Sequence, residues 1–254
     1  MLTQETLEKL RRMRLGAMAR ALELQLSDPR MSDLSFEERV GLLVDHEWTA
    51  RRDRKLGRLV KEARLKFPDA VPEGVNYRAA RGLDKPLLRS LLGGDWLRDG
   101  RAALITGATG LGKTYIACAL GNAACRQGFR TRYYRMPRLL GALELAKADG
   151  SYANLLGRLS AVDLLILDDW GLVPLTAPEA RDLLEVIDDR CTSRSTLISS
   201  QLPVEHWHGT IADPTVADAI LDRLVHSAYR LTLEGESMRK VKPESTTDPK
   251  QQQG

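Results

Sequence analysis

Hydrophobic residues near the beginning of the chain recur at steps of three and four, the period of an amphipathic α-helix. This pattern predicts one helix over residues 2–26 and a second helix that begins at Ser35. Proline at position 29 separates the two, because proline cannot continue a helix and restricts the residue before it. Ser35 and Glu38 have the spacing of a capping box, which fixes the start of the second helix. We therefore expect residues 1–70 to form a small all-helical domain.

After about residue 100 the pattern changes to short apolar runs that alternate with helical stretches. The predicted strands cover residues 102–105, 131–134, 164–167 and 196–199, and the predicted helices cover 113–127, 137–148 and 177–191. Such alternation favours a parallel sheet with helices on both faces, so the predicted fold class is α/β. A cluster of proline and glycine at 67–74 marks the predicted domain boundary. We expect the α/β domain to cover residues 71–240 and a disordered tail to cover 241–254.

Composition limits the classes of protein to which the chain belongs. Hydrophobic residues make up 43% of the 254 residues, which is enough for a sizeable core and excludes wholesale disorder. No apolar run approaches the roughly 18 residues that span a bilayer, and the first residues lack the pattern of a signal peptide. The three cysteines have no CxxC spacing, so neither a disulfide framework nor a zinc site is expected. These features predict a cytoplasmic protein that has no membrane partner.

Charge is unevenly distributed along the chain. Residues 101–160 carry nine basic and two acidic side chains, whereas residues 161–222 carry twelve acidic side chains and three arginines. A basic surface beside an acidic one favours contact with a polyanion. A second basic stripe, in which Arg51, Lys55 and Arg58 share one helical face, has the spacing to neutralise phosphates. An ordinary solvated helix face is an equally good interpretation of that stripe.

A glycine-rich turn follows the first predicted strand. Residues 107–114 read Gly-Ala-Thr-Gly-Leu-Gly-Lys-Thr, which matches the P-loop pattern G-x-x-x-x-G-K-[ST] at each fixed position. Glycines let the backbone N–H groups face a phosphate, and the helix that follows directs its positive end to the same place. Lys113 then reaches the β- and γ-phosphates of ATP, and the Thr114 hydroxyl is a Mg²⁺ ligand. The predicted nucleotide-binding residues are Gly107, Thr109, Gly110, Leu111, Gly112, Lys113, Thr114 and Tyr115.

The third predicted strand ends in two carboxylates, the pattern of a Walker B motif. We expect Asp168 to hold Mg²⁺ beside Thr114, and Asp169 to orient or deprotonate the attacking water. Together with the P-loop these residues form a set for the hydrolysis of ATP to ADP. A P-loop kinase uses similar parts, but it needs a lid and an acceptor site, and the sequence offers neither.

Several stretches resemble the IstB family of insertion-sequence helper ATPases, which are relatives of the DnaC helicase loader in the AAA+ class. The resemblance is carried by residues 107–117, 132–135, 164–171, 199–203, 213–224 and 235–239. It implies a P-loop AAA+ core that binds double-stranded DNA, assembles into ATP-dependent homo-oligomers and assists the transposase of the same insertion sequence. A DnaC-like replicative helicase loader is the alternative, because the motifs barely separate the two. The short remainder after residue 239 implies a core without the usual lid domain.

The resemblance also implies roles for residues outside the two motifs. A polar residue at the end of the fourth strand senses the γ-phosphate in AAA+ proteins, and here Ser200 or Gln201 holds that place. Arg223 matches the position of an arginine finger that reaches the nucleotide of a neighbouring subunit. Arg239 matches a second phosphate sensor. AAA+ proteins commonly end the Walker B motif in Asp-Glu, so the shorter Asp169 implies slow hydrolysis in the absence of DNA or a neighbour.

Related initiators place DNA-contacting helices between the second strand and the Walker B strand. Basic residues in that region therefore join the stripe of the N-terminal domain as candidate DNA contacts. The candidates are Arg51, Arg54, Lys55, Arg58, Arg132, Arg135, Arg138, Lys147 and Arg158. Contacts of this type bind phosphates and read no base sequence. Tyr133 and Tyr134 offer a stacking surface, although packing within a strand is the stronger interpretation.

Overall fold

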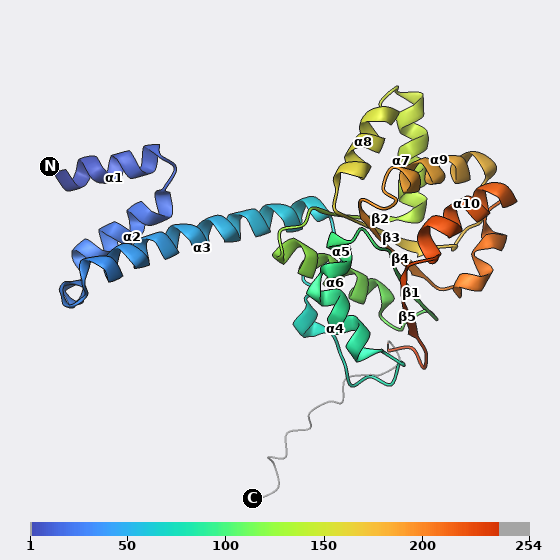
Figure 1. The fold of residues 1–254 in the computed structure, drawn as a ribbon, viewed down its shortest axis with the longest axis horizontal. Coiled ribbons are helices and arrows are strands. Elements are labelled where there is room, and N and C mark those ends of the chain that lie inside the picture. The colour runs from blue at the N-terminus through green and yellow to red at the C-terminus, as the bar shows by residue number, and fades with distance from the viewer. Residues whose placement is uncertain (1, 239–254) are drawn as a thin grey trace, which may run out of the picture. The chain divides into compact units, whose positions relative to one another are not determined.

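The computed structural model describes residues 2–238 (Figure 1). The chain forms two compact units that divide between Arg58 and Leu59. This division lies inside the helix α3 (Phe36–Ala63), ahead of the cluster of proline and glycine at 67–74. The predicted tail over 241–254 lies outside the described residues.

The N-terminal unit is helical. It contains α1 (Leu2–Arg12), α2 (Gly16–Ser27), a 3₁₀ helix at Pro29–Asp33 and the first part of α3. The prediction of a single helix over 2–26 is wrong, because the chain breaks at Arg14, whose φ is 60°. Glycine at position 16 has low helix propensity and weakens the helix at this point. The break lets α1 and α2 pack against each other, and Leu7 and Ala17 are buried in this unit.

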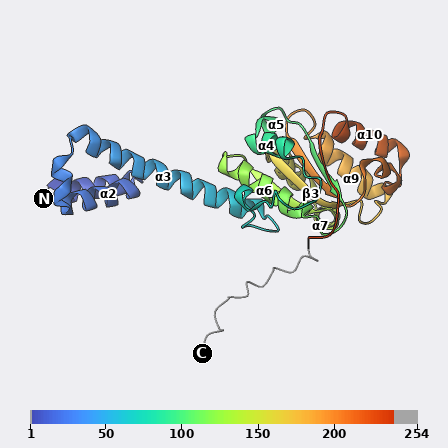
Figure 2. The same ribbon diagram turned by 90° about the horizontal axis from the view of Figure 1, so that it is seen from below.

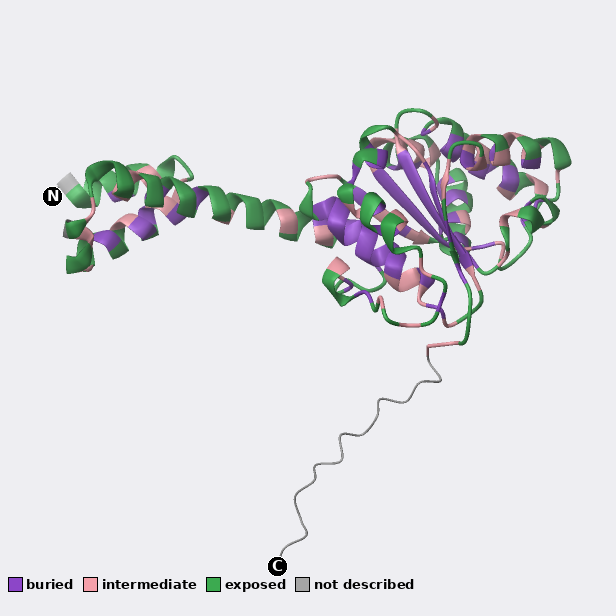
Figure 3. Cartoon of the chain, turned by 60° about the horizontal axis from the view of Figure 1, so that its bottom comes forward, coloured by how far each residue is buried: buried purple, intermediate pink, exposed green. Residues whose placement is uncertain are grey.

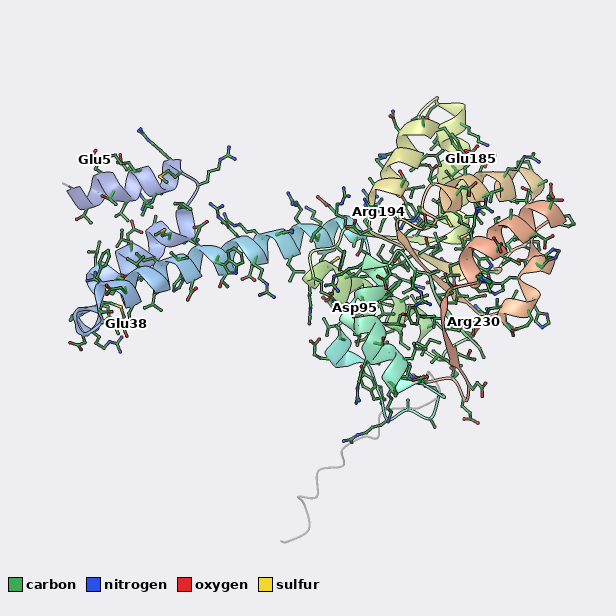
Figure 4. The ribbon with its side chains drawn as sticks, viewed as in Figure 1. Glu5, Glu38, Asp95, Glu185, Arg194 and Arg230 are labelled. Carbon is green, nitrogen blue, oxygen red and sulfur yellow. The ribbon has the colours of Figure 1, made fainter. Side chains whose placement is uncertain are left out.

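Figure 4 labels an acidic residue near the start of α1 and another near the start of α3. The first, Glu5, makes an exposed ion pair of 2.7 Å with Lys9. The second, Glu38, belongs to the predicted capping box, which is confirmed. The Ser35 N–H donates to Glu38 Oε2 (2.8 Å), and the Glu38 N–H donates to the Ser35 hydroxyl (3.2 Å). These bonds satisfy backbone donors that the first turn of a helix otherwise leaves unpaired.

A buried carboxylate on α3 holds the N-terminal unit together. Glu47 is buried, and its Oε2 accepts the backbone N–H groups of Ala17 (2.9 Å) and Met18 (3.1 Å) at the start of α2. Its Oε1 accepts a bond of 2.8 Å from Arg51. The Arg51 guanidinium and the two N–H groups lower the pKa of Glu47 to about 2. Glu47 therefore caps α2 from another helix and places a negative charge at its positive end.

Within the described residues, the second unit contains a five-stranded parallel sheet in the order β2-β3-β4-β1-β5 (Figure 1). The strands are β1 (Ala103–Gly107), β2 (Thr131–Arg135), β3 (Leu164–Trp170), β4 (Ser195–Ser200) and β5 (Tyr229–Leu233). The four predicted strands and the α/β class are confirmed. β5 was not among the predicted strands; it is an edge strand in which exposed residues such as Arg230 (Figure 4) alternate with buried ones.

Helices cover both faces of this sheet, as predicted. The helices are α4 (Lys85–Gly93), α5 (Asp95–Arg98), α6 (Lys113–Arg126), α7 (Met136–Ala148), α8 (Tyr152–Ala161), α9 (Ala177–Asp188) and α10 (Pro214–Val225), with 3₁₀ helices at Pro72–Gly74, Val204–His206 and His208–Thr210. Figure 2 shows α6 and α9 on opposite sides of β3. The α6 face also carries α4, and the other face carries α7, α9 and α10. The central strands are buried on both faces (Figure 3), which explains their continuous apolar runs.

The strand order decides where the two nucleotide motifs meet. β4 lies between β1, which leads into the P-loop, and β3, which ends in the Walker B carboxylates. Residues at the end of β4 therefore lie between the two motifs. All five strands point the same way, so their carboxyl ends form one edge of the sheet, where open α/β sheets bind ligands.

The chain returns to the P-loop after β5. The Glu234 N–H donates to the carbonyl of Arg81 (2.9 Å), and the Met238 N–H donates to the carbonyl of Gly110 (3.0 Å). No helix follows β5 within residues 2–238. None of the helices described here combines the length and the apolar character that are needed to cross a membrane.

Candidate functional site

The predicted P-loop connects β1 to α6 and has the shape that phosphate binding requires. A Cβ at Gly107, whose φ is 144°, would lie 2.3 Å from the carbonyl oxygen of Leu233. A Cβ at Gly112, whose φ is 83°, would lie 2.6 Å from Nη1 of Arg81. A side chain at either position would be strained by the positive φ, and at Gly107 it would also collide with the backbone of β5. α6 begins at Lys113, so its free N–H groups and positive end face the loop.

A cavity of about 400 Å³ lies against this loop. Lys113 and Thr114 line its centre, and the Lys113 ammonium donates to the carbonyl of Ala108 (2.8 Å). The rings of Phe67 and Tyr115, 6.5 Å apart between centroids, line the cavity as well. Leu111, a residue of the loop itself, is fully buried. The cavity therefore offers a cationic, N–H-rich centre for phosphates and an aromatic region for a base.

Asp168 is fully buried and accepts hydrogen bonds from three hydroxyl groups. Thr114 donates to it at 2.9 Å, Tyr133 at 2.7 Å and Ser199 at 2.6 Å. The contact between Thr114 and Asp168 is the one that the sequence analysis expects of two Mg²⁺ ligands. A buried carboxylate oxygen beside a threonine hydroxyl is a donor set that suits this hard cation.

The second carboxylate of the motif lies on a β-bulge. The register of β3 against β4 shifts between Leu167 and Trp170, and Asp169 takes a left-handed backbone conformation with a φ of 62°. Its carboxylate accepts a hydrogen bond of 2.7 Å from Nε of Arg135, the last residue of β2. The expected water-directing acid is therefore in an ion pair with an expected DNA contact.

The two candidate sensors at the end of β4 differ in their surroundings. Ser200 is fully buried, and its hydroxyl donates to the carbonyl of Trp170 (2.8 Å) and accepts from the Leu202 N–H (3.0 Å). Gln201 is exposed, and its Oε1 accepts a bond of 2.6 Å from the Thr109 hydroxyl in the P-loop. Gln201 is therefore the member of the pair that contacts the loop.

Arg223 lies at the opposite edge of the sheet from the P-loop. It lines a cavity together with Arg101 and Arg194, next to the first residues of β1 and β4. Its guanidinium pairs with Asp188, the last residue of α9, and donates to the carbonyl of Ala219 (2.8 Å). Arg223 does not line the cavity beside the P-loop. Arg239, the other predicted sensor, lies outside the described residues.

Comparisons of the sequence with known proteins identify the family to which the chain belongs. A family model described as IstB-like ATP binding protein matches residues 8–246. The chain belongs to this family. An insertion sequence ATP-binding protein of Sinorhizobium fredii is 50% identical over 240 residues, which cover 94% of this chain and 98% of that protein. An insertion sequence ATP-binding protein of Pseudomonas fluorescens is 53% identical over 203 residues, which cover 80% of this chain and 88% of that protein.

A solved structure supports the same fold. The crystal structure of DnaI matches 65% of the IstB-like chain and 91% of its own chain, with a TM-score of 0.57 and 18% identity. Identity this low shows the fold alone, which is the AAA+ type of P-loop α/β fold. The description of the family is that of an ATP binding protein, so the chain belongs to a family of nucleotide-binding proteins.

The basic residues that the sequence analysis proposed for DNA lie in two groups in this IstB-like protein. In the N-terminal unit, Arg51 and Arg54 bond Glu47 at 2.8 and 3.2 Å, whereas Lys55 and Arg58 are exposed on the same helix. Arg51 and Arg54 therefore also have a structural role, which the sequence analysis did not foresee.

The second group surrounds β2, an edge strand. Arg132 donates to the carbonyl of Glu62 (3.0 Å) and lies over the ring of Tyr134, and Lys147 pairs with Asp182. Arg138 and Arg158 are exposed on α7 and α8. A groove of about 600 Å³ runs beside β2, and Arg64, Arg130, Arg132 and Arg158 line it.

Three residues of the site were missed. Ser199 and Tyr133 bind Asp168, but the sequence analysis considered only the neighbours of Ser199 as sensors and only stacking or packing for Tyr133. Tyr133 lies in the middle of β2 and Ser199 near the end of β4, and only the strand order, which places both strands beside β3, brings them to Asp168. Arg81 lines the nucleotide cavity from a loop without any recognised motif.

Proposed function

We propose that this IstB-like protein is an ATPase that assembles on double-stranded target DNA and assists the transposase of the same insertion sequence. The observation that carries the proposal is the buried Asp168 within hydrogen-bond distance of Thr114, beside a complete P-loop. A strand that merely ended in acids would not bring a carboxylate to the threonine of a phosphate-binding loop.

Each residue of the cavity has its own role in hydrolysis. Lys113 and the N–H groups at the start of α6 bind the β- and γ-phosphates. Thr114 and Asp168 hold Mg²⁺, which supplies positive charge that offsets the charge developing on the phosphates. Asp169 orients the attacking water, and Gln201 senses the γ-phosphate through its contact with the loop. Water attacks the γ-phosphorus, the bond to the bridging oxygen breaks, and ADP and inorganic phosphate are the products.

The ion pair between Asp169 and Arg135 supports slow hydrolysis that DNA stimulates. While Arg135 binds the carboxylate at 2.7 Å, the carboxylate is less available as an acceptor for water. DNA phosphates compete for an exposed arginine, and their binding to Arg135 would release Asp169. Arg135→Ala should therefore raise the basal rate and remove stimulation by DNA. Arg138→Ala, three residues later on an exposed position, should weaken DNA binding and leave the basal rate unchanged.

Assembly would complete the site. Because Arg223 lies at the edge of the sheet opposite its own P-loop, its guanidinium can reach a γ-phosphate only in a neighbouring subunit. To do so it must leave Asp188. An arginine supplied in this way is worth roughly 10³- to 10⁵-fold in rate in well-studied NTPases. This supports an ATP-dependent homo-oligomer.

Two observations support the link to transposition. The relatives at 50% and 53% identity are named for insertion sequences, which favours this role over that of a replicative helicase loader. Exposed basic residues on α3 and along the groove beside β2 supply the phosphate contacts that duplex DNA requires. A transposase gene beside the gene of this chain would distinguish the two roles.

The test is ATP turnover by the full-length protein, with Mg²⁺ or a chelator and with or without duplex DNA. We expect slow turnover that needs Mg²⁺ and rises with DNA, and Asp169→Asn should bind ATP without hydrolysing it. Asp163→Asn is the matched control, because Asp163 pairs with Arg194 beside the start of the same strand (Figure 4 labels Arg194). Turnover by Asp169→Asn at the rate of the unmodified protein would refute the proposal.

Sizing the protein with ATP and with ADP, each with and without DNA, tests assembly. We expect a larger species with ATP and DNA than in the other three conditions. A monomer in all four would exclude the oligomer. Insertion by the cognate transposase should increase when the protein and ATP are added, and an unchanged insertion rate would exclude the role as a helper.

A further inference from the structure

An arginine is buried against the cavity beside the P-loop and has no acidic partner among the described residues. Arg81 is only 2% exposed, yet it lines the same cavity as Lys113 and Thr114. Among residues 2–238, no carboxylate pairs with it. Burial also lowers the pKa of this guanidinium below its ordinary value. An isolated charge removed from water is costly to a fold, so its retention at this place calls for an explanation.

The neighbours of Arg81 fix its position without neutralising its charge. Its Nη1 donates to the carbonyl of Leu111 in the P-loop (2.8 Å), and its Nη2 donates to the carbonyl of Asn76 (2.9 Å). Its Nη1 also lies 3.3 Å from the sulfur of Met238. These groups are neutral acceptors. Within the described part of the chain, Nε is buried and has no hydrogen-bond partner.

Hydrogen bonds fix the conformation of the loop that carries Arg81. The side-chain Oδ1 of Asn76 accepts the N–H groups of Arg78 (2.9 Å) and Ala79 (3.1 Å), which turns the chain just before Arg81. The Arg81 carbonyl accepts the Glu234 N–H. A Cβ at Gly112 would lie 2.6 Å from the guanidinium, so glycine at this position also makes room for Arg81.

The position of Arg81 identifies the part of a nucleotide that it faces. Asp169, Ser199 and Gln201, which belong to the ends of β3 and β4 and the residue that follows β4, line the part of the cavity where the proposed function places hydrolysis. Arg81 comes instead from the loop that begins at Asn76, beside the segment that carries Phe67 and Gly74. Because a base and a ribose carry no charge, the anionic group nearest to that end of a bound nucleotide is the phosphate attached to the ribose.

We propose that Arg81 is a nucleotide-binding residue whose guanidinium binds the phosphate next to the ribose. Its bonds to Leu111 and Asn76 fix the guanidinium in place, and the phosphate supplies a negative charge that none of residues 2–238 supplies. The proposal rests on nucleotide binding at the P-loop, which is part of the proposed function. It adds that the affinities for ADP and for ATP should depend on Arg81 to the same extent, because both nucleotides carry this phosphate.

Arg190 provides a matched control. It is also a buried arginine (1% exposed) whose guanidinium donates to backbone carbonyls, including that of Val162 (2.9 Å), but it does not line the nucleotide cavity. A purely structural role for Arg81 would make the two arginines behave alike. A role in binding would separate them.

The experiment measures the Kd of ADP and of ATP, and the unfolding temperature with and without ADP, for the full-length protein. Arg81→Gln should raise the Kd of ADP and the Kd of ATP by the same factor, about 10- to 100-fold. Arg190→Lys should lower the unfolding temperature of the nucleotide-free protein and leave both Kd values within twofold. Arg81→Gln that binds ADP within twofold of the unmodified protein would overturn the proposal.

A second variant covers the case in which Arg81→Gln does not fold. Arg81→Lys keeps the charge but loses the fork of donors, so ADP should raise its unfolding temperature less than that of the unmodified protein. An unchanged shift would overturn the proposal. Failure of the unmodified protein to bind ADP would instead refute the nucleotide site as a whole, whereas loss of DNA binding or of helper activity would leave the inference intact.

Discussion

Removing one of the three hydroxyl groups that bond Asp168 should strongly lower the free energy of unfolding. Tyr133→Phe deletes the donor that lies 2.7 Å from Asp168 and leaves a ring of the same shape in place. A hydrogen bond to a charged group contributes about 1.5–3 kcal/mol. Asp168 is fully buried, so water cannot replace the lost donor. We therefore expect the free energy of unfolding of the α/β unit to fall by about 1.5–3 kcal/mol.

For a unit of this size, each kcal/mol corresponds to roughly 2–4 °C, so the unfolding temperature should fall by about 3–12 °C. The assay is thermal unfolding of the nucleotide-free protein, followed by circular dichroism. Burial and the bond to Asp168 raise the pKa of Tyr133 above its ordinary value, so the tyrosine stays protonated. The effect should consequently be the same at pH 6 and pH 9.

The neighbouring tyrosine offers a control. The Tyr134 hydroxyl lies 3.4 Å from Nη2 of Arg132 and is partly buried, so Tyr134→Phe should change the free energy of unfolding by less than about 0.5 kcal/mol. Equal unfolding temperatures for the two phenylalanine variants would refute the reasoning. Ser199→Ala should show coupling of about 0.5–3 kcal/mol with Tyr133→Phe in a double-mutant cycle, because both hydroxyls bind the same carboxylate.

Other parts of the molecule give further predictions. Because the pKa of Glu47 is lowered to about 2 in the fold, its stabilising contribution is complete above about pH 4.5 and is lost as the pH falls towards 2. Glu47→Gln should unfold more easily at pH 7 and match the unmodified protein near pH 2 in a circular dichroism titration; equal stability at pH 7 would contradict this. Arg223→Ala should bind ATP normally but hydrolyse it slowly, and mixing it with Asp169→Asn should restore turnover, because each variant supplies what the other lacks. No recovery in the mixture would argue against a finger supplied by a neighbour. Gln201→Ala should lower kcat with little change in unfolding temperature, whereas Ser200→Ala should do the reverse, and a shared effect on kcat would mean that both act as sensors.

The parts of the site that lie in continuous motifs were predictable. The P-loop is recognisable because its glycines, lysine and threonine are fixed by the geometry of phosphate binding over eight consecutive residues. The pairing of Thr114 with Asp168 followed from the same chemistry, although 54 residues separate them. Three of the four predicted strands, β1, β3 and β4, were predictable because they lie inside the sheet and both of their faces are buried.

The parts that depend on strand order were not predictable. Contacts of Tyr133 and Arg135 with the Walker B carboxylates exist because β2 lies next to β3, and nothing in the spacing of the chain states which strands are neighbours. Arg81 precedes the P-loop by 26 residues and belongs to no periodic pattern, so only the folded chain reveals that it is buried. The break at Arg14 was hidden because the hydrophobic period continues through it.

The left-handed backbone at Asp169 restricts which amino acids this position accepts. Glycine, asparagine and aspartate adopt a φ near 62° more readily than other residues, and for longer or β-branched side chains the same conformation costs more free energy. Glutamate, the residue common in related motifs, would gain reach here only by straining the main chain or by flattening the bulge. The short side chain of Asp169 and the bulge of β3 therefore depend on each other. A variant that lengthens the side chain at position 169 should be combined with a change that straightens β3.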